Sequence, residues 1–451
     1  MNNSTSKTAY LCSSCGNDFP KWFGQCPACH EWGTLAEYKQ SKKKKGRGQT
    51  TRSDVTPLND VVIDESGARI STRITEVDRV LGKGLLKGTL VLLGGHPGIG
   101  KSTLALQIVG GVEHSTLYVS AEESQEQIAL RAKRLNIDTG KLSLSNENNV
   151  ENIIEQIEID KPDLVIIDSI QTVYVDTLDS MPGSISQVRE SGQQFLQVCK
   201  QKRISIMIIG HVTKEGTIAG PKMLEHMVDT VLYLEGDERY DHRILRSVKN
   251  RFGATNEVGI FQMGEDGMAE VANPSELFLA EKIDNVPGSA VYPSMEGTRP
   301  ILIEVQALVS KANFGNPQRN VNGIDLRRLA MLLAVLEKRL KIPMGMNDIF
   351  VNLVGGMRID DPAADLAIIS SIASSALNKS IPSDTILIGE VGLAGEVRSV
   401  SQLSKRLNEA EMLGFKKAFI PKFKSANSKY DPKKIEVERV STVRDAFDNL
   451  F

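Results

Sequence analysis

Apolar runs of strand length alternate with amphipathic, helix-like stretches through the middle of the chain. The strongest strand candidates are residues 117–120, 164–168, 204–210 and 230–234. Short, continuous apolar runs are typical of strands that are buried on both faces of a parallel sheet. We therefore predict an α/β unit over residues 56–273, in which helices cover a largely parallel sheet.

Two further units flank this one, as expected for 451 residues. Residues 10–38 form a cysteine-rich segment, and residues 39–55 form a polar, basic stretch that we expect to be a flexible linker. After a break near Pro274, residues 280–451 again mix the two patterns. In that last unit the sequence predicts strands at 290–292, 301–308, 349–352, 385–389 and 417–420, and helices at 325–339, 363–377 and 403–412.

Composition narrows the class of protein. Hydrophobic residues make up 41% of the chain and charged residues 24%, which is typical of a soluble globular protein. No apolar run approaches the roughly 20 residues that a membrane span needs, and the first residues lack the core of a signal peptide. We therefore expect a cytoplasmic protein. Because the formal net charge is only −2, any binding of nucleic acid must come from local patches.

A phosphate-binding loop follows an apolar run at 90–93 and leads into a helical pattern at 103–109. It matches the pattern G-x-x-x-x-G-K-[ST], whose glycines let backbone N–H groups point at phosphate oxygens. Its lysine supplies a cation to the phosphates, and its serine hydroxyl suits Mg²⁺. The loop consists of Gly95, His96, Pro97, Gly98, Ile99, Gly100, Lys101 and Ser102. We therefore predict a site for a nucleoside triphosphate with Mg²⁺.

Polar residues at the ends of three predicted strands suit the rest of such a site. Asp168 ends one apolar run, a position from which a carboxylate can hold Mg²⁺ through water. Glu122 and Glu123 follow another run; either could orient the attacking water, and both could instead complement a helix dipole. His211 follows a third run, where it could sense the γ-phosphate, although a lone histidine is more often structural.

Four of the five cysteines form two C-x₂-C pairs that are separated by ten residues: Cys12, Cys15, Cys26 and Cys29. Four thiolates at this spacing can complete a tetrahedral Zn²⁺ site that leaves no open position, so we expect a structural metal. Redox cysteines and an iron–sulfur cluster are the alternatives. Cys199 stands alone in a helical pattern and is not expected to be a ligand.

Several longer stretches are specific in combination. They are Lys-Asn-Arg-Phe-Gly at 249–253, Trp-Phe-Gly-Gln-Cys-Pro at 22–27, Tyr-Val-Ser-Ala-Glu-Glu-Ser at 118–124 and the glycine-rich loop at 94–102. Together they resemble the RadA family, also called Sms, of bacterial DNA repair ATPases. The resemblance extends over essentially the whole chain, with the domains in the same order. It implies a RecA-like ATPase core between a zinc ribbon and a C-terminal domain similar to that of Lon protease.

The resemblance also implies roles for particular residues. In RecA-type ATPases the γ-phosphate of ATP lies at a subunit interface, and Lys249 and Arg251 match the residues that reach it from the neighbouring subunit. Glu122, rather than Glu123, falls where RecA carries its water-activating carboxylate. His211 falls where RecA carries its phosphate-sensing glutamine. A homo-oligomer, expected to be a hexameric ring, follows from the same resemblance.

Two segments fall where RecA-like proteins place their DNA-facing loops, at 181–189 and 213–222. They contain glycines and isolated cations, including Lys214 and Lys222, which suit contact with DNA phosphates; ordinary solvated loops are the alternative. The lysines at 42–45 either bind DNA or belong to a solvated linker. The resemblance implies single-stranded and branched DNA as substrates and RecA recombinase as a partner.

The C-terminal unit departs from Lon protease at the two positions that matter for peptide hydrolysis. Ala363 falls at the nucleophilic serine of Lon, and Ser404 falls at its lysine. Local positive charge instead suggests assembly or DNA contact, from Lys405, Arg406, Lys416, Lys417, Lys422 and Lys424. We expect a DNA-dependent ATPase or helicase that drives branch migration in recombinational repair. A Lon-type protease and a non-motor nucleotide switch are the alternatives.

Overall fold

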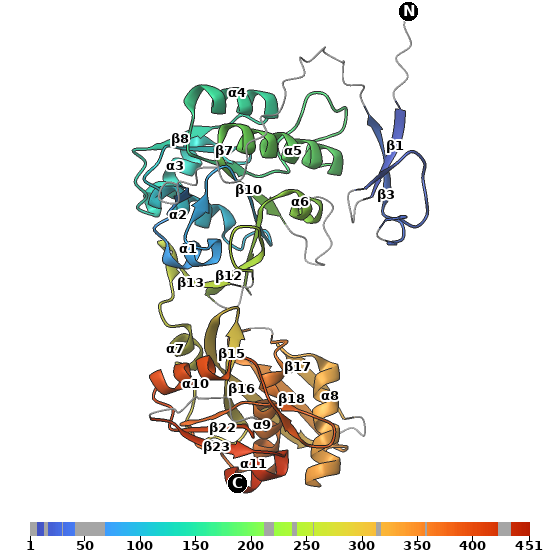
Figure 1. Ribbon diagram of the computed structural model, residues 1–451, viewed down its shortest axis with the longest axis vertical. Helices are drawn as coiled ribbons and strands as arrows, with labels where there is room; N and C mark the ends of the chain where they lie inside the picture. The colour runs from blue at the N-terminus through green and yellow to red at the C-terminus, as the bar shows by residue number, and fades with distance from the viewer. Residues whose placement is uncertain are drawn as a thin grey trace, which may run out of the picture. The chain divides into compact units, whose positions relative to one another are not determined.

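The computed structural model describes residues 7–12, 17–28, 30–40, 68–211, 221–236, 241–255, 257–312, 317–356, 359–422 and 434–451. The chain divides into two compact units, Met1–Glu270 and Val271–Phe451, drawn in Figure 1. Several predicted residues lie outside the described ones, namely Cys15, Cys29, Lys214, Lys424 and the lysines at 42–45. For Lys222 only the backbone is described.

The first strands of the chain form a small antiparallel sheet in the order β2-β1-β3. Its strands are β1 (Lys7–Cys12), β2 (Asp18–Phe19) and β3 (Leu35–Gln40). Only a few side chains are buried here, with Cys12, Cys26 and Leu35 at the centre. A core of this size is too small to hold a fold on its own, which is why a bound metal is expected.

A nine-stranded sheet, in the order β14-β13-β12-β11-β6-β10-β9-β7-β8, forms the centre of the first unit. The strands from β11 to β8 pair in parallel, which confirms the predicted α/β fold with its largely parallel sheet. The three strands from β12 to β14 extend the sheet in antiparallel fashion. The strands are β6 (Leu90–Gly95), β7 (Thr116–Ser120), β8 (Leu142–Ser145), β9 (Leu164–Asp168), β10 (Ser205–His211), β11 (Thr230–Glu235), β12 (His242–Asn250), β13 (Val258–Gly264) and β14 (Gly267–Glu270).

Two apolar cores lie on the two faces of this sheet. Alternate residues of one strand enter different cores: Val91 and Leu93 enter one, and Leu90 and Leu92 enter the other. Burial on both faces explains why the parallel strands read as continuous apolar runs. The first core includes α1 (Thr75–Leu81), α2 (Lys101–Gly111) and α3 (Gln125–Arg134), and the second includes α4 (Val150–Asp160), α5 (Ile185–Lys202) and α6 (Pro221–Met227) (Figure 1). A separate short hairpin joins β4 (Arg69–Ile70) and β5 (Leu85–Leu86).

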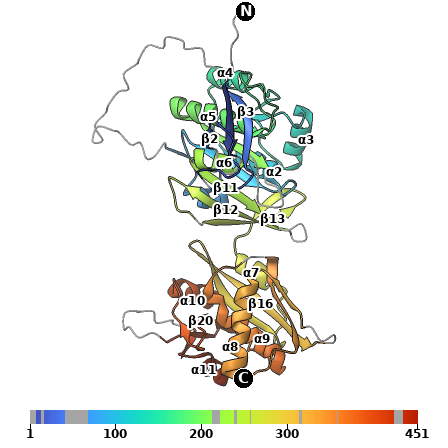
Figure 2. The same ribbon diagram turned by 90° about the vertical axis from the view of Figure 1, so that its right-hand side faces the viewer.

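The second unit contains a mixed seven-stranded sheet in the order β17-β18-β16-β15-β19-β22-β23 and a two-stranded sheet of β20 and β21. Helices α9 and α10 pack against β15 and β16 (Figure 2). The strands are β15 (Ser289–Glu296), β16 (Arg299–Lys311), β17 (Arg319–Asn322), β18 (Asn347–Leu353), β19 (Thr385–Leu387), β20 (Glu390–Val391), β21 (Val397–Arg398), β22 (Lys417–Pro421) and β23 (Glu436–Val440). The helices are α7 (Pro274–Leu279), α8 (Leu326–Val335), α9 (Asp365–Leu377), α10 (Leu403–Met412) and α11 (Val443–Leu450).

Two helices of this unit differ in detail from the predicted ones. The predicted helix at 325–339 is α8 followed by a π-helical turn, Leu336–Leu340. The predicted helix at 363–377 is α9 preceded by a 3₁₀ turn, Pro362–Ala364, whose first position suits proline because the N–H that proline lacks would have no partner there. No helix among the described residues is long and apolar enough to cross a membrane.

Candidate nucleotide-binding site

The phosphate-binding loop lies between the end of β6 and the start of α2, as predicted. Gly98 and Gly100 adopt φ angles of 79° and 110°, in the left-handed region that favours glycine. The N-cap residue of α2 is Gly100, which has no side chain that could cap the first turn, so the backbone N–H groups there remain available to an anion. A helix N-terminus that follows such a loop is a suitable site for phosphate.

Lys101 is the first residue of α2, and its side chain folds back onto the loop. Its Nζ donates hydrogen bonds to the carbonyl oxygens of Gly95 and His96, both at 2.9 Å. Burial lowers the pKa of Lys101 to about 8, while the charges of Asp168 and Glu122 oppose this change. The ammonium therefore lies at the loop with acidic groups nearby, in the position from which it would meet phosphate charge.

Asp168 ends β9 beside the loop and is 6% exposed. The hydroxyl of Tyr118 donates a hydrogen bond of 2.6 Å to Asp168 Oδ2, and Ser102 also forms a hydrogen bond with this carboxylate. Burial raises the pKa of Asp168, while the two hydroxyl groups oppose this change. A carboxylate and a hydroxyl in contact form an oxygen donor set that suits a hard cation such as Mg²⁺. Ser102 and Asp168 therefore fit the predicted metal.

Glu122 and Glu123 are adjacent in the sequence, but their side chains have different partners in the structure. Ser169 Oγ donates a hydrogen bond of 2.6 Å to Glu122 Oε1, and His211 Nε2 lies 3.5 Å from the same oxygen. The hydrogen bond from His211 lowers the pKa of Glu122 although burial opposes it. Glu123 instead forms an ion pair of 2.5 Å with Arg131 of α3. Of the two glutamates, Glu122 is therefore the one that contacts His211.

Lys249 and Arg251 lie near the amino-terminal ends of the parallel strands, whereas the phosphate-binding loop lies at their carboxyl-terminal ends. Asn250 pairs with Thr230, the first residue of β11, whereas Leu234 near the end of β11 pairs with Gly95. At about 3.3 Å per residue, the intervening length of parallel strand is roughly 13 Å. Because of this distance, neither Lys249 nor Arg251 is placed to bind a phosphate held by the loop of its own chain.

Both cations have partners within the chain. Lys249 Nζ donates to three carbonyl oxygens at the end of α6, those of Glu225 at 2.7 Å, His226 at 3.2 Å and Val228 at 2.8 Å. Burial, followed by the charge of Arg251, lowers the pKa of Lys249. The side chain of Arg251 is 54% exposed, and its Nη1 lies 3.3 Å from the buried carboxylate of Asp229.

The turn that carries these cations is fixed by its own residues. Asn250 Nδ2 donates to the carbonyl oxygen of Leu81, and Asn250 Oδ1 accepts from the backbone N–H of Phe252. Arg69 Nη2 donates to the carbonyl oxygen of Phe252 at 2.7 Å. A Cβ atom on Gly253 would lie 2.7 Å from Asn250 Nδ2, so any other residue at this position would have to displace the Asn250 amide from these hydrogen bonds.

The predicted zinc site is described only in part. Cys12 and Cys26 are buried together in the small core beside Tyr10, Phe19 and Phe23. Two sulfur atoms in so small a core suit a thiophilic metal such as Zn²⁺. Cys199 lies in the second core of the large sheet, with its Sγ 3.6 Å from the carbonyl oxygen of Thr89. Burial raises the pKa of Cys199 to about 12, which is unfavourable for a metal-binding thiolate.

The position that resembles the Lon nucleophile lies in an internal polar network. Ala363 is buried in the 3₁₀ turn after Asp361. Asp361 Oδ2 accepts hydrogen bonds from Arg406 at 2.6 Å and from Tyr292 at 3.1 Å. Arg406 is only 1% exposed and also donates to the carbonyl oxygen of Pro293. The prediction that Arg406 contributes positive surface charge is therefore wrong, because its guanidinium is inside the fold.

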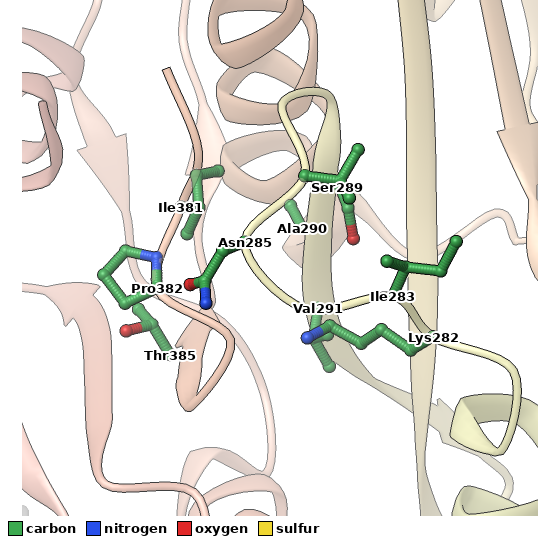
Figure 3. Close-up of a pocket in the computed structure, with 10 residues that line it drawn as sticks. Lys282, Ile283, Asn285, Ser289, Ala290, Val291, Ile381, Pro382 and Thr385 are labelled. Atoms are coloured by element: carbon green, nitrogen blue, oxygen red, sulfur yellow. The ribbon is translucent and has the colours of Figure 1, made fainter.

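A small pocket in the second unit is lined mainly by apolar side chains, and its empty volume of about 230 Å³ includes open solvent (Figure 3). Two of its residues are a serine and a lysine, but each is engaged elsewhere. Ser289 Oγ donates to Glu304 Oε1, and Lys282 Nζ donates to the carbonyl oxygen of Ser383. The pocket therefore does not supply the serine–lysine pair that the Lon-like positions lack.

Comparison with known proteins links this geometry to function. Residues 70–268 match the ATPase family described as KaiC, residues 10–37 match the rubredoxin metal binding domain, and residues 315–424 match the subunit ChlI of Mg-chelatase. The protein described as "DNA repair protein RadA" from Halalkalibacterium halodurans is 48% identical over 450 residues, 98% of each chain. Those from Bacillus subtilis and Listeria monocytogenes are 48% and 47% identical and cover 98% and 97% of both chains.

Proposed function

The chain belongs to the RadA family of DNA repair proteins, and on that premise we propose that it converts ATP hydrolysis into movement along DNA during recombination. Membership of the family makes it a DNA repair ATPase with a RecA-like core. Our proposal adds helicase-type translocation, branch migration of recombination intermediates and cooperation with RecA recombinase. The observation that carries it is the placement of the phosphate-binding loop and the Lys249–Arg251 turn at opposite edges of one sheet.

The proposed hydrolytic roles follow from the contacts at the loop edge. Lys101 would stabilise phosphate charge, and Ser102 and Asp168 would hold Mg²⁺, which neutralises phosphate charge when bound. Glu122 has a lowered pKa and is therefore a carboxylate at neutral pH, able to orient the attacking water and accept its proton. Because His211 Nε2 lies 3.5 Å from Glu122 Oε1, we infer that it relays the state of the γ-phosphate to that base.

We further propose that each ATP site is completed by a neighbouring copy of the chain. A cation at the far edge of the sheet can meet a phosphate only if another subunit brings its loop to that edge. Arg251 is suited to this role, since its side chain is half exposed and a guanidinium binds phosphate oxygens in pairs. A closed ring, such as a hexamer, provides that contact at every site.

The proposed DNA contacts lie in the two segments that resemble RecA-type DNA loops. Met181 is 82% exposed at the start of the first segment, and such an apolar side chain can contact unstacked bases. Helix α5 begins at Ile185, so only residues 181–184 of this segment lie outside a helix. Gln187 of α5 supports them, because its side chain bonds to the backbone of Val175, Leu178 and Ser180. Lys214 and Lys222 of the second segment would meet the phosphates of single-stranded or branched DNA.

One assay separates this proposal from its two rivals. ATP hydrolysis is measured with and without single-stranded DNA, beside a casein digestion control. A DNA motor shows faster hydrolysis with DNA and no digestion. A nucleotide switch shows no response to DNA, and a Lon-type protease digests casein. The protease has no support at the Lon-like positions, since Ala363 has no hydroxyl and Ser404 has no amine.

A further inference from the structure

We propose that Tyr118 is a positioning residue of the Mg²⁺ site: its hydroxyl holds one oxygen of Asp168, so that the carboxylate keeps the orientation in which it meets Ser102. The inference rests on the proposed nucleotide site, because it concerns how that site is held together. Tyr118 itself would touch neither phosphate nor metal. Its effect passes entirely through Asp168.

The strand register brings the two side chains together. β7 and β9 are parallel neighbours, with Tyr118 opposite Ile166 and Ser120 opposite Asp168. Side chains two residues apart on a strand share a face, so Tyr118 lies on the same face as Asp168 and one pleat behind it. The ring is 1% exposed in the first core, and its hydroxyl extends forward to Asp168 Oδ2 at 2.6 Å.

The chemistry of this bond suits a holding role. A tyrosine hydroxyl keeps its proton at neutral pH, so Tyr118 donates to Asp168 Oδ2. A hydroxyl that donates to a carboxylate forms a short, strong hydrogen bond with a defined direction. Since Oδ2 is engaged by Tyr118, rotation of the carboxylate would break this bond. Hydrogen-bond partners of this kind fix the orientation of metal-binding carboxylates.

Phenylalanine would fill the same space but leave Asp168 free to rotate. The carboxylate would also lose one of the two hydroxyl groups with which it forms hydrogen bonds, those of Tyr118 and Ser102. Loss of such an outer partner commonly weakens metal affinity by about 10- to 100-fold. The expected defect of Tyr118→Phe is therefore specific to Mg²⁺ and leaves nucleotide contacts at the loop itself in place.

The chain offers a closely matched control. Tyr292 is also fully buried, and its hydroxyl also donates to an aspartate, Asp361 Oδ2, at 3.1 Å. It belongs to the second unit, whereas Asp168 and the phosphate-binding loop belong to the first. Tyr292→Phe therefore removes the same kind of bond without touching Asp168.

The test uses the full-length chain and measures the affinity for ATPγS by calorimetry, in EDTA and across a Mg²⁺ titration. Tyr118→Phe should match the wild-type protein in EDTA, need about 10- to 100-fold more Mg²⁺ for tight binding, and recover wild-type affinity at saturating Mg²⁺. That recovery also shows that the variant is folded. Tyr292→Phe should titrate like the wild type. In an Asp168→Asn background, Tyr118→Phe should cause no further loss, because the effect passes through that carboxylate.

The outcomes separate the inference from the proposed function. If the wild-type chain shows no Mg²⁺-dependent binding of ATPγS, the proposed site itself fails. If the wild type binds and Tyr118→Phe has an unchanged Mg²⁺ requirement, the inference alone is overturned. An equal loss of affinity in EDTA and in Mg²⁺, or the same shift in Tyr292→Phe, also overturns it, because either result shows a general structural role.

Discussion

Replacing Glu122 with glutamine should abolish most ATP hydrolysis while leaving the nucleotide site assembled. The change is nearly isosteric, and an amide oxygen can still accept the hydrogen bond that Ser169 Oγ gives to Oε1. What is lost is the negative charge that the hydrogen bond from His211 favours by lowering the pKa of Glu122. An uncharged amide cannot take a proton from the attacking water.

The size of the effect follows from that role. A positioned general base commonly contributes about 10²- to 10⁴-fold to a rate, so turnover of Glu122→Gln should fall by that factor while ATP affinity changes little. Glu123→Gln is the matched control. It removes the ion pair with Arg131; both side chains are partly exposed, and such pairs contribute about 0.2 to 1 kcal/mol to stability. Its turnover should remain close to that of the wild type.

The measurement is steady-state phosphate release with saturating single-stranded DNA, together with equilibrium binding of ATP to each variant. Because the pKa of Glu122 is lowered, its base form is complete at neutral pH and is lost only as the pH falls through the lowered value. Wild-type turnover should therefore show no loss of this base across the neutral range. If Glu122→Gln keeps nearly full turnover while Glu123→Gln loses it, the assignment drawn from Ser169 and His211 is wrong.

Three further outcomes test other parts of the account. Arg251→Ala should bind ATP but hydrolyse it slowly. Mixing it with Lys101→Ala subunits, which retain Arg251, should restore part of the hydrolysis rate. If mixed rings show no restoration, the ATP site is not completed by the neighbouring subunit. Cys26→Ser should lose bound zinc by metal analysis and still bind ATP, whereas full zinc content would exclude this ligand. Arg406→Ala should destabilise the second unit by about 1 to 3 kcal/mol in thermal or denaturant unfolding, because it removes a fully buried guanidinium and its hydrogen bonds to Asp361 and Pro293. The exposed neighbour Lys405→Ala should change the stability by less than about 0.5 kcal/mol, and equal effects would show that the internal network contributes little.

The parts that the sequence predicts well are those that short stretches of chain determine. The phosphate-binding loop needs only a buried strand, positive-φ glycines and a helix start, all within residues 90–111. The parallel strands β6, β7, β9 and β10 are buried on both faces, so their apolar runs are distinct in the sequence, whereas the partly exposed parallel strand β8 has no such run and is not predicted. The antiparallel strands β12, β13 and β14 were not predicted, because their buried and exposed positions alternate irregularly and their pairing is set by neighbours in space.

The parts that it misses depend on contacts between distant residues. In the sequence, Tyr118 looks like one more apolar residue of a buried strand. Side chains two residues apart on a strand share a face, so Tyr118 lies on the same face as Ser120, which pairs with Asp168. This alternation is the signal that could have linked Tyr118 to Asp168. Arg406 reads as surface charge because arginine is seldom buried, and only the fold reveals its partner Asp361, 45 positions away. Sequence reasoning also gave no role to Ser169, whose contact separates the two adjacent glutamates.

The two cations of the Lys249–Arg251 turn are held very differently, and this bears on how neighbouring sites would communicate. Lys249 satisfies three carbonyl oxygens at the end of α6, so it can meet a neighbour's phosphate only by leaving that helix end uncapped. Arg251 is half exposed and has one ion pair, so it can reach outward at smaller cost. A phosphate attracts an ammonium more strongly than neutral carbonyl groups do. Movement of Lys249 from the carbonyl oxygens at the end of α6 to a phosphate therefore becomes favourable only when the neighbouring subunit holds a nucleotide across the interface. In the proposed ring, Arg251 would therefore engage first, and transfer of Lys249 would link the nucleotide state of one subunit to helix α6 of the next.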